Sequence, residues 1–162
     1  MSRSITPFRA SLAITLIAFA TIAGAWIFEA FGYLPCELCL KQRWAYYAGV
    51  PLAAITTLVA ARNEKLARPL LWLLALLFFG SMIFGVYHSG VEWGFWPGPT
   101  TCTGAATTAG SMDDFMKQLQ TTQVVQCDKV AIRILGLSLA GWNAVISAAM
   151  SALAVIGARA KR

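Results

Sequence analysis

The chain has 162 residues, of which 58% are apolar and only 12% are charged. A soluble domain usually carries about twice that share of charged residues. The composition therefore excludes a soluble enzyme, a nucleic-acid-binding module and a disordered tail, in spite of a formal net charge of +6. The length suits one domain and leaves no room for a second core of ordinary size.

Four stretches lack charged residues and are rich in Leu, Ile, Ala, Val and Phe: residues 10–28, 44–61, 69–91 and 134–158. A helix needs roughly 20 apolar residues to cross a bilayer. Lipid offers no partner to open backbone groups, and these stretches are too long and too uniformly apolar for barrel strands. We therefore predict an all-α integral membrane protein, a single domain over residues 1–162. We expect a four-helix bundle with spans at approximately 10–30, 44–61, 69–90 and 136–158.

The predicted spans leave two connecting segments on one side, at approximately 31–43 and 91–134. A further charge-free stretch, residues 93–112, is predicted to be loop, because 11 of its 20 residues are Gly, Pro or Thr. Pro97 and Pro99 also prevent a continuous helix there. Within the loop at 91–134, Ser111 can cap a short helix with an apolar stripe. We expect this helix to lie in the membrane interface or to pack on the loop's own aromatic residues.

The distribution of Lys and Arg predicts the orientation of the bundle. The side with both termini has one acid, Glu64, and eight cations: Arg3, Arg9, Arg62, Lys65, Arg68, Arg159, Lys161 and Arg162. The opposite side has five cations and six acids. We therefore expect both termini in the cytoplasm and both loops facing outward.

The N-terminal segment also resembles a secretory signal, with two early Arg residues, an apolar run and an Ala-Gly-Ala sequence typical of a cleavage site. The apolar run continues through residues 26–28, which favours an uncleaved first helix. The outward side of the protein would be the same in either case.

The four cysteines, Cys36, Cys39, Cys102 and Cys127, all lie on the predicted outer side. Thiols outside the cytosol tend to be oxidised, and four cysteines permit three disulfide pairings. Two structural disulfides, a four-thiolate zinc site and a redox site are the alternatives. Zinc is disfavoured because the second pair lacks the tight spacing of such sites. Haem attachment is excluded because Leu40 follows the CxxC where a His is required.

The environment of the CxxC favours the redox alternative. Pro35 suits the first position of a helix, so Cys36 to Cys39 should occupy the first turn of the second span. Free backbone N–H groups and the positive end of the helix dipole stabilise a thiolate there. Arg43 lies four residues after Cys39 and so shares its helix face, where a fixed cation would stabilise the thiolate further.

Residues 34–43, with the sequence LPCELCLKQR, resemble the start of the second membrane helix in the DsbB family. These bacterial inner-membrane proteins make disulfides by passing electrons to quinone. The resemblance covers nearly the whole chain and includes the four spans, the CxxC and the outward loop with a second cysteine pair. It also includes the motifs YHSGVEW at 87–93, WPGP at 96–99, Cys127-Asp128 and LGLS at 135–138.

The resemblance implies an electron relay through the four cysteines. Cys102 would form a mixed disulfide with a soluble periplasmic thioredoxin-fold oxidase of the DsbA type. Cys127 would then attack Cys36 and release Cys39 as a thiolate beside the quinone. The expected location is the bacterial inner membrane, with the redox cysteines facing the periplasm.

The resemblance also implies that the electron acceptor is a quinone, either ubiquinone or menaquinone, and that Arg43 and His88 lie at its head group. It implies no metal. A second interpretation makes His88 an interfacial residue that anchors the third span beside Tyr87 and Trp93.

Three other functions are compatible with parts of the pattern. A vitamin K epoxide reductase-like enzyme also joins a CxxC to quinone, but its CxxC comes late, after the loop pair. A non-enzymatic membrane adaptor would hold two structural disulfides. A carrier that reduces the outer compartment would need cysteines within the membrane or facing the cytosol, and this chain has none there.

Overall fold

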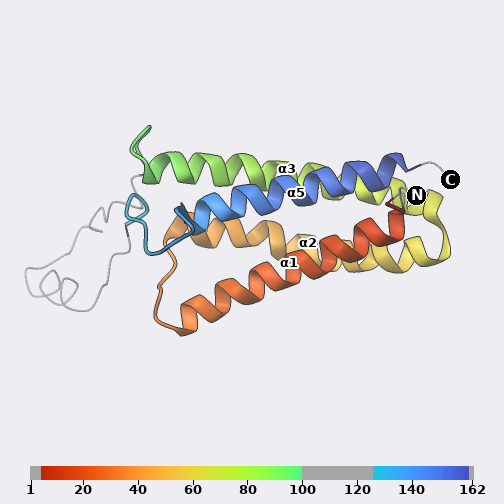
Figure 1. Ribbon diagram of the computed structural model, residues 1–162, viewed down its shortest axis with the longest axis horizontal. Coiled ribbons are helices and arrows are strands. Elements are labelled where there is room, and N and C mark those ends of the chain that lie inside the picture. Colours follow the sequence, from red (N-terminus) through yellow and green to blue (C-terminus); the bar gives the residue numbers. More distant parts are fainter. Residues whose placement is uncertain (1–4, 100–125, 161–162) are drawn as a thin grey trace, which may run out of the picture.

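The computed structural model describes residues 5–99 and 126–160. Within these residues four long helices run along one another (Figure 1): α1 (Pro7–Ala30), α2 (Glu37–Arg62), α3 (Glu64–Glu92) and α5 (Leu139–Arg159). All four are long and apolar enough to cross a membrane. The predicted fold class, a four-helix membrane bundle, is therefore confirmed.

The helices pack mainly with their neighbours along the chain, and α5 closes the bundle by packing on α3 and α1. Figure 1 shows both ends of the described chain at one end of the bundle, together with the link between α2 and α3. The turn between α1 and α2 and the segment before α5 lie at the opposite end. The predicted grouping of the connecting segments into two sides agrees with this arrangement.

Side-chain caps define where the helices begin. The Oγ1 atom of Thr6 accepts the N–H of Arg9 at the start of α1. The single residue between α2 and α3 is Asn63, whose side chain accepts the N–H groups of Lys65 and Leu66. These oxygens satisfy backbone donors that the first helical turn leaves without partners. The sharp reversal at Asn63 therefore needs no long loop.

Small residues allow the helices to approach closely, as is common in membrane bundles. A Cβ atom added to Gly85 of α3 would lie 2.9 Å from the backbone nitrogen of Ala144 in α5. A Cβ on Gly157 would lie 2.5 Å from the Cβ of Ala10. Large apolar residues such as Leu58 and Leu76, each 67% exposed, point away from the bundle, as expected for side chains in contact with lipid.

The helix boundaries differ from the predicted ones at the end of the bundle that carries the turn between α1 and α2. We call it the outward end, because the sequence predicts that it faces outward. The helix α2 begins at Glu37, so residues 37–43 are helical and not loop. Cys36 is the N-cap, and its sulfur accepts the N–H of Cys39. Pro35 thus precedes the cap and does not occupy the first helical position, which corrects our assignment.

The start of α5 also differs, because a small hairpin precedes it. The strands β1 (Arg133–Ile134) and β2 (Leu137–Ser138) pair antiparallel, with Arg133 opposite Ser138. The two turn residues, Leu135 and Gly136, both have positive φ, at 52° and 84°. This geometry suits a tight two-residue hairpin, and it delays the helix to Leu139. The helix predicted from Ser111 lies outside the described residues.

Candidate functional site

The CxxC lies at the outward end of α2. The sulfurs of Cys36 and Cys39 are 2.9 Å apart, and both residues are free cysteines. The Sγ atom of Cys36 also lies 3.3 Å from the backbone nitrogen of Cys39, which donates to it. The first turn of the helix therefore holds the two sulfurs together and supplies a donor to one of them.

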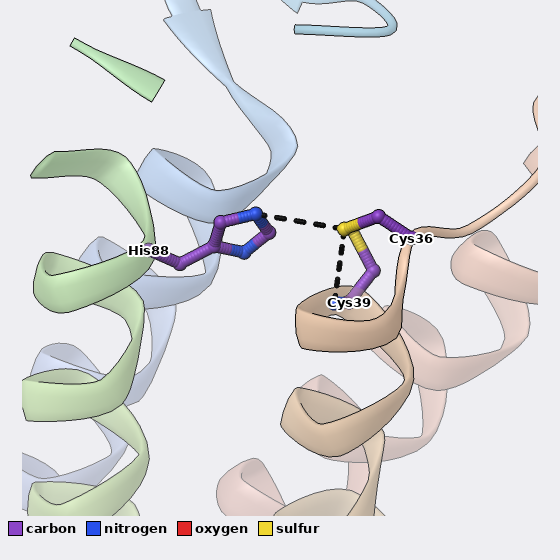
Figure 2. Close-up of side chains that lie close together, drawn as sticks. All are labelled: Cys36, Cys39 and His88. Atoms are coloured by element: carbon purple, nitrogen blue, oxygen red, sulfur yellow. Dashed lines mark hydrogen bonds between the residues drawn. The ribbon is translucent and has the colours of Figure 1, made fainter. Parts of the chain in front are cut away.

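His88, from the outward end of α3, faces this pair. Figure 2 shows its ring pointing at Cys36, with Nε2 3.6 Å from the sulfur. The side chain is 1% exposed, and Nδ1 has no hydrogen-bond partner among the described residues. The structure thus places His88 of α3 against Cys36 at the start of α2.

The surroundings of Cys36 favour its ionised form. The hydrogen bond from the Cys39 side chain lowers the pKa of Cys36 to about 4, although burial acts in the opposite direction. The hydrogen bond and the charge of His88 lower the pKa further, as does the backbone N–H of Cys39. Cys36 is therefore the more acidic thiol of the reduced pair. The Cys39 thiolate that the resemblance implies belongs to another state, in which Cys36 is bonded to Cys127.

Cys127 reaches the same place from the segment before α5. It is 2% exposed and belongs to one buried cluster with Cys36, Leu38 and Val91, and Cys39 packs against this cluster. Cys127 is disulfide-bonded. The structure therefore brings together three of the four predicted redox cysteines, and Cys102 lies outside the described residues.

A cavity of about 330 Å³ adjoins the CxxC at Cys39. Residues of α1, α2 and α5 and of the turn before α2 line it, and most of its wall is apolar. Cys39 and Arg43 are in its lining, whereas His88 and Cys36 are not. The two sulfurs thus have different surroundings, since Cys36 contacts the histidine and Cys39 borders the cavity.

Arg43 is held in place by α1. Its guanidinium donates to the Glu29 carboxylate at 2.6 Å and to the carbonyl oxygen of Ala25 at 3.4 Å. The Arg43 side chain is only 11% exposed, whereas that of Glu29 is 41% exposed, so the ion pair is buried on the arginine side only. Sequence reasoning missed Glu29, although an acid at the end of an apolar run was a usable signal.

Polar residues deeper in the cavity were also missed. Gln42 and Asn143 line it and are 9% and 7% exposed. The Tyr46 hydroxyl donates to Oδ1 of Asn143 at 2.6 Å. For Asn143 the available signal was a lone amide inside an apolar span, because such residues are costly in a membrane and often functional. Gln42 fell in a segment predicted to be loop and gave no such signal.

A contact between α3 and α5 supports the site from outside. The Ser138 hydroxyl, which caps α5, donates to the Glu92 carboxylate at the end of α3. Glu92 is also close enough to Cys36 and His88 for their charges to interact. The start of α5 is therefore attached to the helix that carries His88.

The cluster around Cys36 has the donor set of a metal site as well. One donor atom from each of Cys36, Cys39 and His88 lies within 4.8 Å of the others. Two thiolates and one imidazole are ligands that zinc accepts, and these residues could hold it in the reduced state. The same three groups also make up a thiolate activated by an imidazole, which is the arrangement of a reactive dithiol.

The chain is similar in sequence to one known protein family. The model of the family described as disulfide bond formation protein DsbB matches residues 8–157. No solved structure matches the chain.

Three curated proteins give a similar result. An uncharacterized protein of Rickettsia prowazekii is 28% identical over 85% of this chain and 79% of its own length. Two proteins named disulfide bond formation protein B are 26% and 29% identical. That of Albidiferax ferrireducens matches over 89% of this chain and 80% of its own length. That of Verminephrobacter eiseniae matches over 97% and 91%. With nearly the whole chain covered by the family model, this multi-pass membrane protein belongs to the DsbB family of disulfide bond formation proteins.

Proposed function

We propose that this protein is a quinone-dependent disulfide oxidase that reoxidises a soluble DsbA-like thioredoxin-fold protein. Two electrons and two protons leave the dithiol of that partner and end on membrane quinone. The observation that carries the proposal is the position of the CxxC. Cys36 packs in one cluster with Cys127, and Cys39 borders an apolar cavity in the membrane-spanning bundle.

The first half of the relay is thiol–disulfide exchange with the soluble partner. A thiolate of the reduced partner attacks Cys102 of a Cys102–Cys127 disulfide, and Cys127 leaves as a thiolate. Cys127 then attacks Cys36 of the oxidised CxxC, and Cys39 leaves as a thiolate. The burial of Cys127 in the Cys36 cluster supports this step, because an attacking sulfur must reach its target.

The second half restores the loop pair. The partner's second thiol attacks the mixed disulfide, so the partner departs oxidised and Cys102 is released. Cys102 then attacks Cys127 of the Cys36–Cys127 bond, which remakes the loop disulfide and frees Cys36. At this point the two electrons reside in the Cys36–Cys39 dithiol, and every disulfide broken has been matched by one formed.

The cavity has the properties that a quinone head group needs. Its volume of about 330 Å³ lies in the range of small-molecule sites. Apolar residues of the first and last helices suit the ring and its lipid-soluble tail, and Arg43 supplies N–H donors for a carbonyl oxygen. A quinone bound here would accept two electrons and two protons from the dithiol.

Each polar residue of the site then has a task. Arg43 supplies a positive charge to the cavity that Cys39 borders, and Glu29 fixes the guanidinium there. His88 stabilises Cys36 as a thiolate, which makes Cys36 a better leaving group when the mixed Cys36–Cys127 bond is opened. In this assignment His88 serves the thiol side of the relay.

We further propose that the bundle lies in a bacterial inner membrane with the CxxC facing the periplasm. The opposite end carries Arg62, Lys65, Arg68 and Arg159, which the positive-inside rule places in the cytoplasm. The DsbA-like partner and an oxidising compartment are on the same side in this orientation.

The test is reduction of quinone by the purified protein in lipid nanodiscs, with a reduced DsbA-like oxidase as electron donor. We expect one quinone reduced for each partner disulfide formed. Cys36→Ser and Cys39→Ser should abolish turnover while the protein remains inserted and folded. Absence of turnover in the wild-type protein, or full turnover in either variant, would overturn the proposal. A membrane adaptor with inert disulfides would give the first of these results.

A further inference from the structure

Two buried amides line the cavity below the CxxC, and each has an N–H group with no hydrogen-bond partner among the described residues. They are Nε2 of Gln42 in α2 and Nδ2 of Asn143 in α5. Both residues are more than nine-tenths buried, at 9% and 7% exposed. Lipid and apolar side chains cannot satisfy such donors, so an unpaired amide inside a membrane bundle is unfavourable. Two of them in one cavity indicate an acceptor from a ligand.

Contacts behind the cavity orient the Asn143 amide. The Tyr46 hydroxyl donates to Oδ1 of Asn143 at 2.6 Å, and Tyr46 also lies 3.3 Å from the Ser147 hydroxyl. Ser147 in turn donates to Ser81 of α3 at 3.0 Å. Because this network occupies the amide oxygen of Asn143, the amide group that remains for a ligand is a donor.

The donors of the cavity come from different walls. Arg43 leans toward α1, where Glu29 and Ala25 hold it. Asn143 belongs to α5, and Gln42 lies three residues after Cys39 on the adjoining part of α2. A flat ring beside Cys39 can therefore meet the guanidinium with one edge and the amides with another. The two carbonyl oxygens of a para-quinone lie on opposite edges of its ring.

We infer that Gln42 and Asn143 form a second carbonyl-binding subsite, whose amide N–H groups bind the quinone carbonyl opposite to the one bound by Arg43. This inference rests on the proposed quinone-dependent function. Reduction places new charge and protons on both oxygens of a quinone, so a site with donors at both ends binds both carbonyls. Gln42 and Asn143 are positioning residues for the ring, and Tyr46 orients Asn143.

The experiment uses infrared difference spectra of short-chain ubiquinone bound to the full-length oxidised protein in nanodiscs. The quinone carries ¹³C at C1 in one preparation and at C4 in the other, so each carbonyl stretch is identified separately. No electron donor is added, and the readout is therefore independent of turnover. We expect both stretches to lie below those of free ubiquinone, since each carbonyl accepts a hydrogen bond.

Asn143→Leu and Gln42→Leu should each shift the stretching frequency of the same labelled carbonyl toward that of free ubiquinone. The frequency of the other carbonyl should not change. Arg43→Ala should do the converse. The dissociation constant for ubiquinone should rise roughly two- to tenfold in each amide variant, as for loss of a neutral hydrogen bond. Ser151→Ala is the matched control, because it removes a hydrogen bond from α5 to the carbonyl oxygen of Ala75 in α3 and lies outside the lining of the cavity.

Three results would overturn the inference. The first is an unshifted second carbonyl in the wild-type protein, and the second is an amide variant with wild-type spectra. The third is the same spectral change in Ser151→Ala as in Asn143→Leu, which would assign the effect to helix packing. In all three cases the proposed function survives if the wild-type protein still reduces quinone, whereas a protein that neither binds nor reduces quinone refutes both.

Discussion

His88 and Cys36, which are 52 positions apart in the sequence, meet at the outward end of the bundle with Nε2 of the histidine 3.6 Å from Sγ of the cysteine. This contact gives the two sulfurs of the CxxC different chemistry. Cys36 has an imidazole and a buried Cys127 as neighbours, and Cys39 has the apolar cavity. One dithiol thus lies between a buried cysteine cluster and an apolar cavity, and the proposed relay needs both.

The first prediction concerns the pH dependence of Cys36 reactivity. With its pKa lowered to about 4, Cys36 in the reduced protein is a thiolate above that pH and becomes a thiol below it. An ordinary cysteine has a pKa of about 8.5, so it loses its proton only near pH 8.5. The rate of alkylation of Cys36 by iodoacetamide, which gives a thioether that Cys39 cannot displace, should therefore stay high from pH 8 down to about pH 5. Mass spectrometry of the labelled peptide measures it. Cys39→Ala is the control, since it removes the hydrogen bond that lowers the pKa most. A half-maximal rate near pH 8 in the wild-type protein would contradict the assignment of the thiolate.

The second prediction separates His88 from the quinone. His88→Ala should raise the pKa of Cys36, because the hydrogen bond and the charge of the histidine both lower it. Opening of the Cys36–Cys127 bond should then be slower, and the KM for quinone should hardly change, since His88 is outside the cavity lining. His88→Gln retains a donor and should restore part of the rate. A large rise in quinone KM in both variants would instead place His88 at the head group.

The third prediction concerns Arg43 and its anchor Glu29. Lys keeps the charge of Arg43 but lacks the planar set of donors that binds Glu29 and a second acceptor together. Arg43→Lys should raise the KM for quinone, and Arg43→Ala should lower kcat/KM roughly ten- to a hundredfold, as for loss of a charge-assisted hydrogen bond. Glu29→Gln should give a smaller effect in the same direction. Thiol exchange with the soluble partner, measured without quinone, serves as the control and should be nearly unaffected. Wild-type kinetics in Arg43→Ala would remove this residue from the site.

The fourth prediction tests the resolving role of Cys127. Cys127→Ser leaves Cys102 as a free thiol, which attacks the disulfide of the oxidised partner and releases one partner thiolate. No Cys127 is present to displace the partner from Cys102, so a covalent complex should accumulate on non-reducing gels. Cys39→Ser, which keeps Cys127 and interrupts a later step, is the comparison. Absence of the complex with excess oxidised partner would contradict the order of exchange proposed above.

The fifth prediction tests close helix packing independently of the redox site. A Cβ on Gly85 would approach the Ala144 backbone to 2.9 Å, whereas one on Gly80 of the same helix would meet nothing within 4 Å. Gly85→Ala should therefore lower the free energy of unfolding by about 1–3 kcal/mol, as overpacking does. Gly80→Ala should not destabilise the protein. Unfolding in mixed detergent micelles measures both, and equal stability of the two variants would contradict the described packing of α3 on α5.

The helices and their grouping into two sides were predictable because both depend on local composition. A run of apolar residues has few alternatives in lipid, and Lys and Arg gather at one end of the bundle. The cysteines were recognisable from spacing and from the resemblance. What failed was local geometry without a strong signal, such as the position of Pro35 before the N-cap of α2 and the hairpin turn at Leu135, a residue that rarely adopts positive φ.

The partners within the site were not predictable for a different reason. The contacts of Arg43 with Glu29, of His88 with Cys36 and of Tyr46 with Asn143 join separate helices. They depend on how far each helix is rotated and shifted along its neighbour, and a charge-free run does not specify either quantity. The sequence suggested which side chains are chemically able to act, but it could not pair them.

The cavity walls come from the first, second and last membrane helices, and this has a consequence for how the protein is made. A ribosome delivers α1 and α2 to the membrane long before α5, so the CxxC enters the membrane at a stage when one wall of its cavity has not yet been synthesised. Cys127 and the Ser138 cap arrive with that last segment. In the proposed relay, electron transfer to quinone would therefore begin only when translation is almost complete, and a chain truncated before α5 would have a CxxC beside an incomplete cavity.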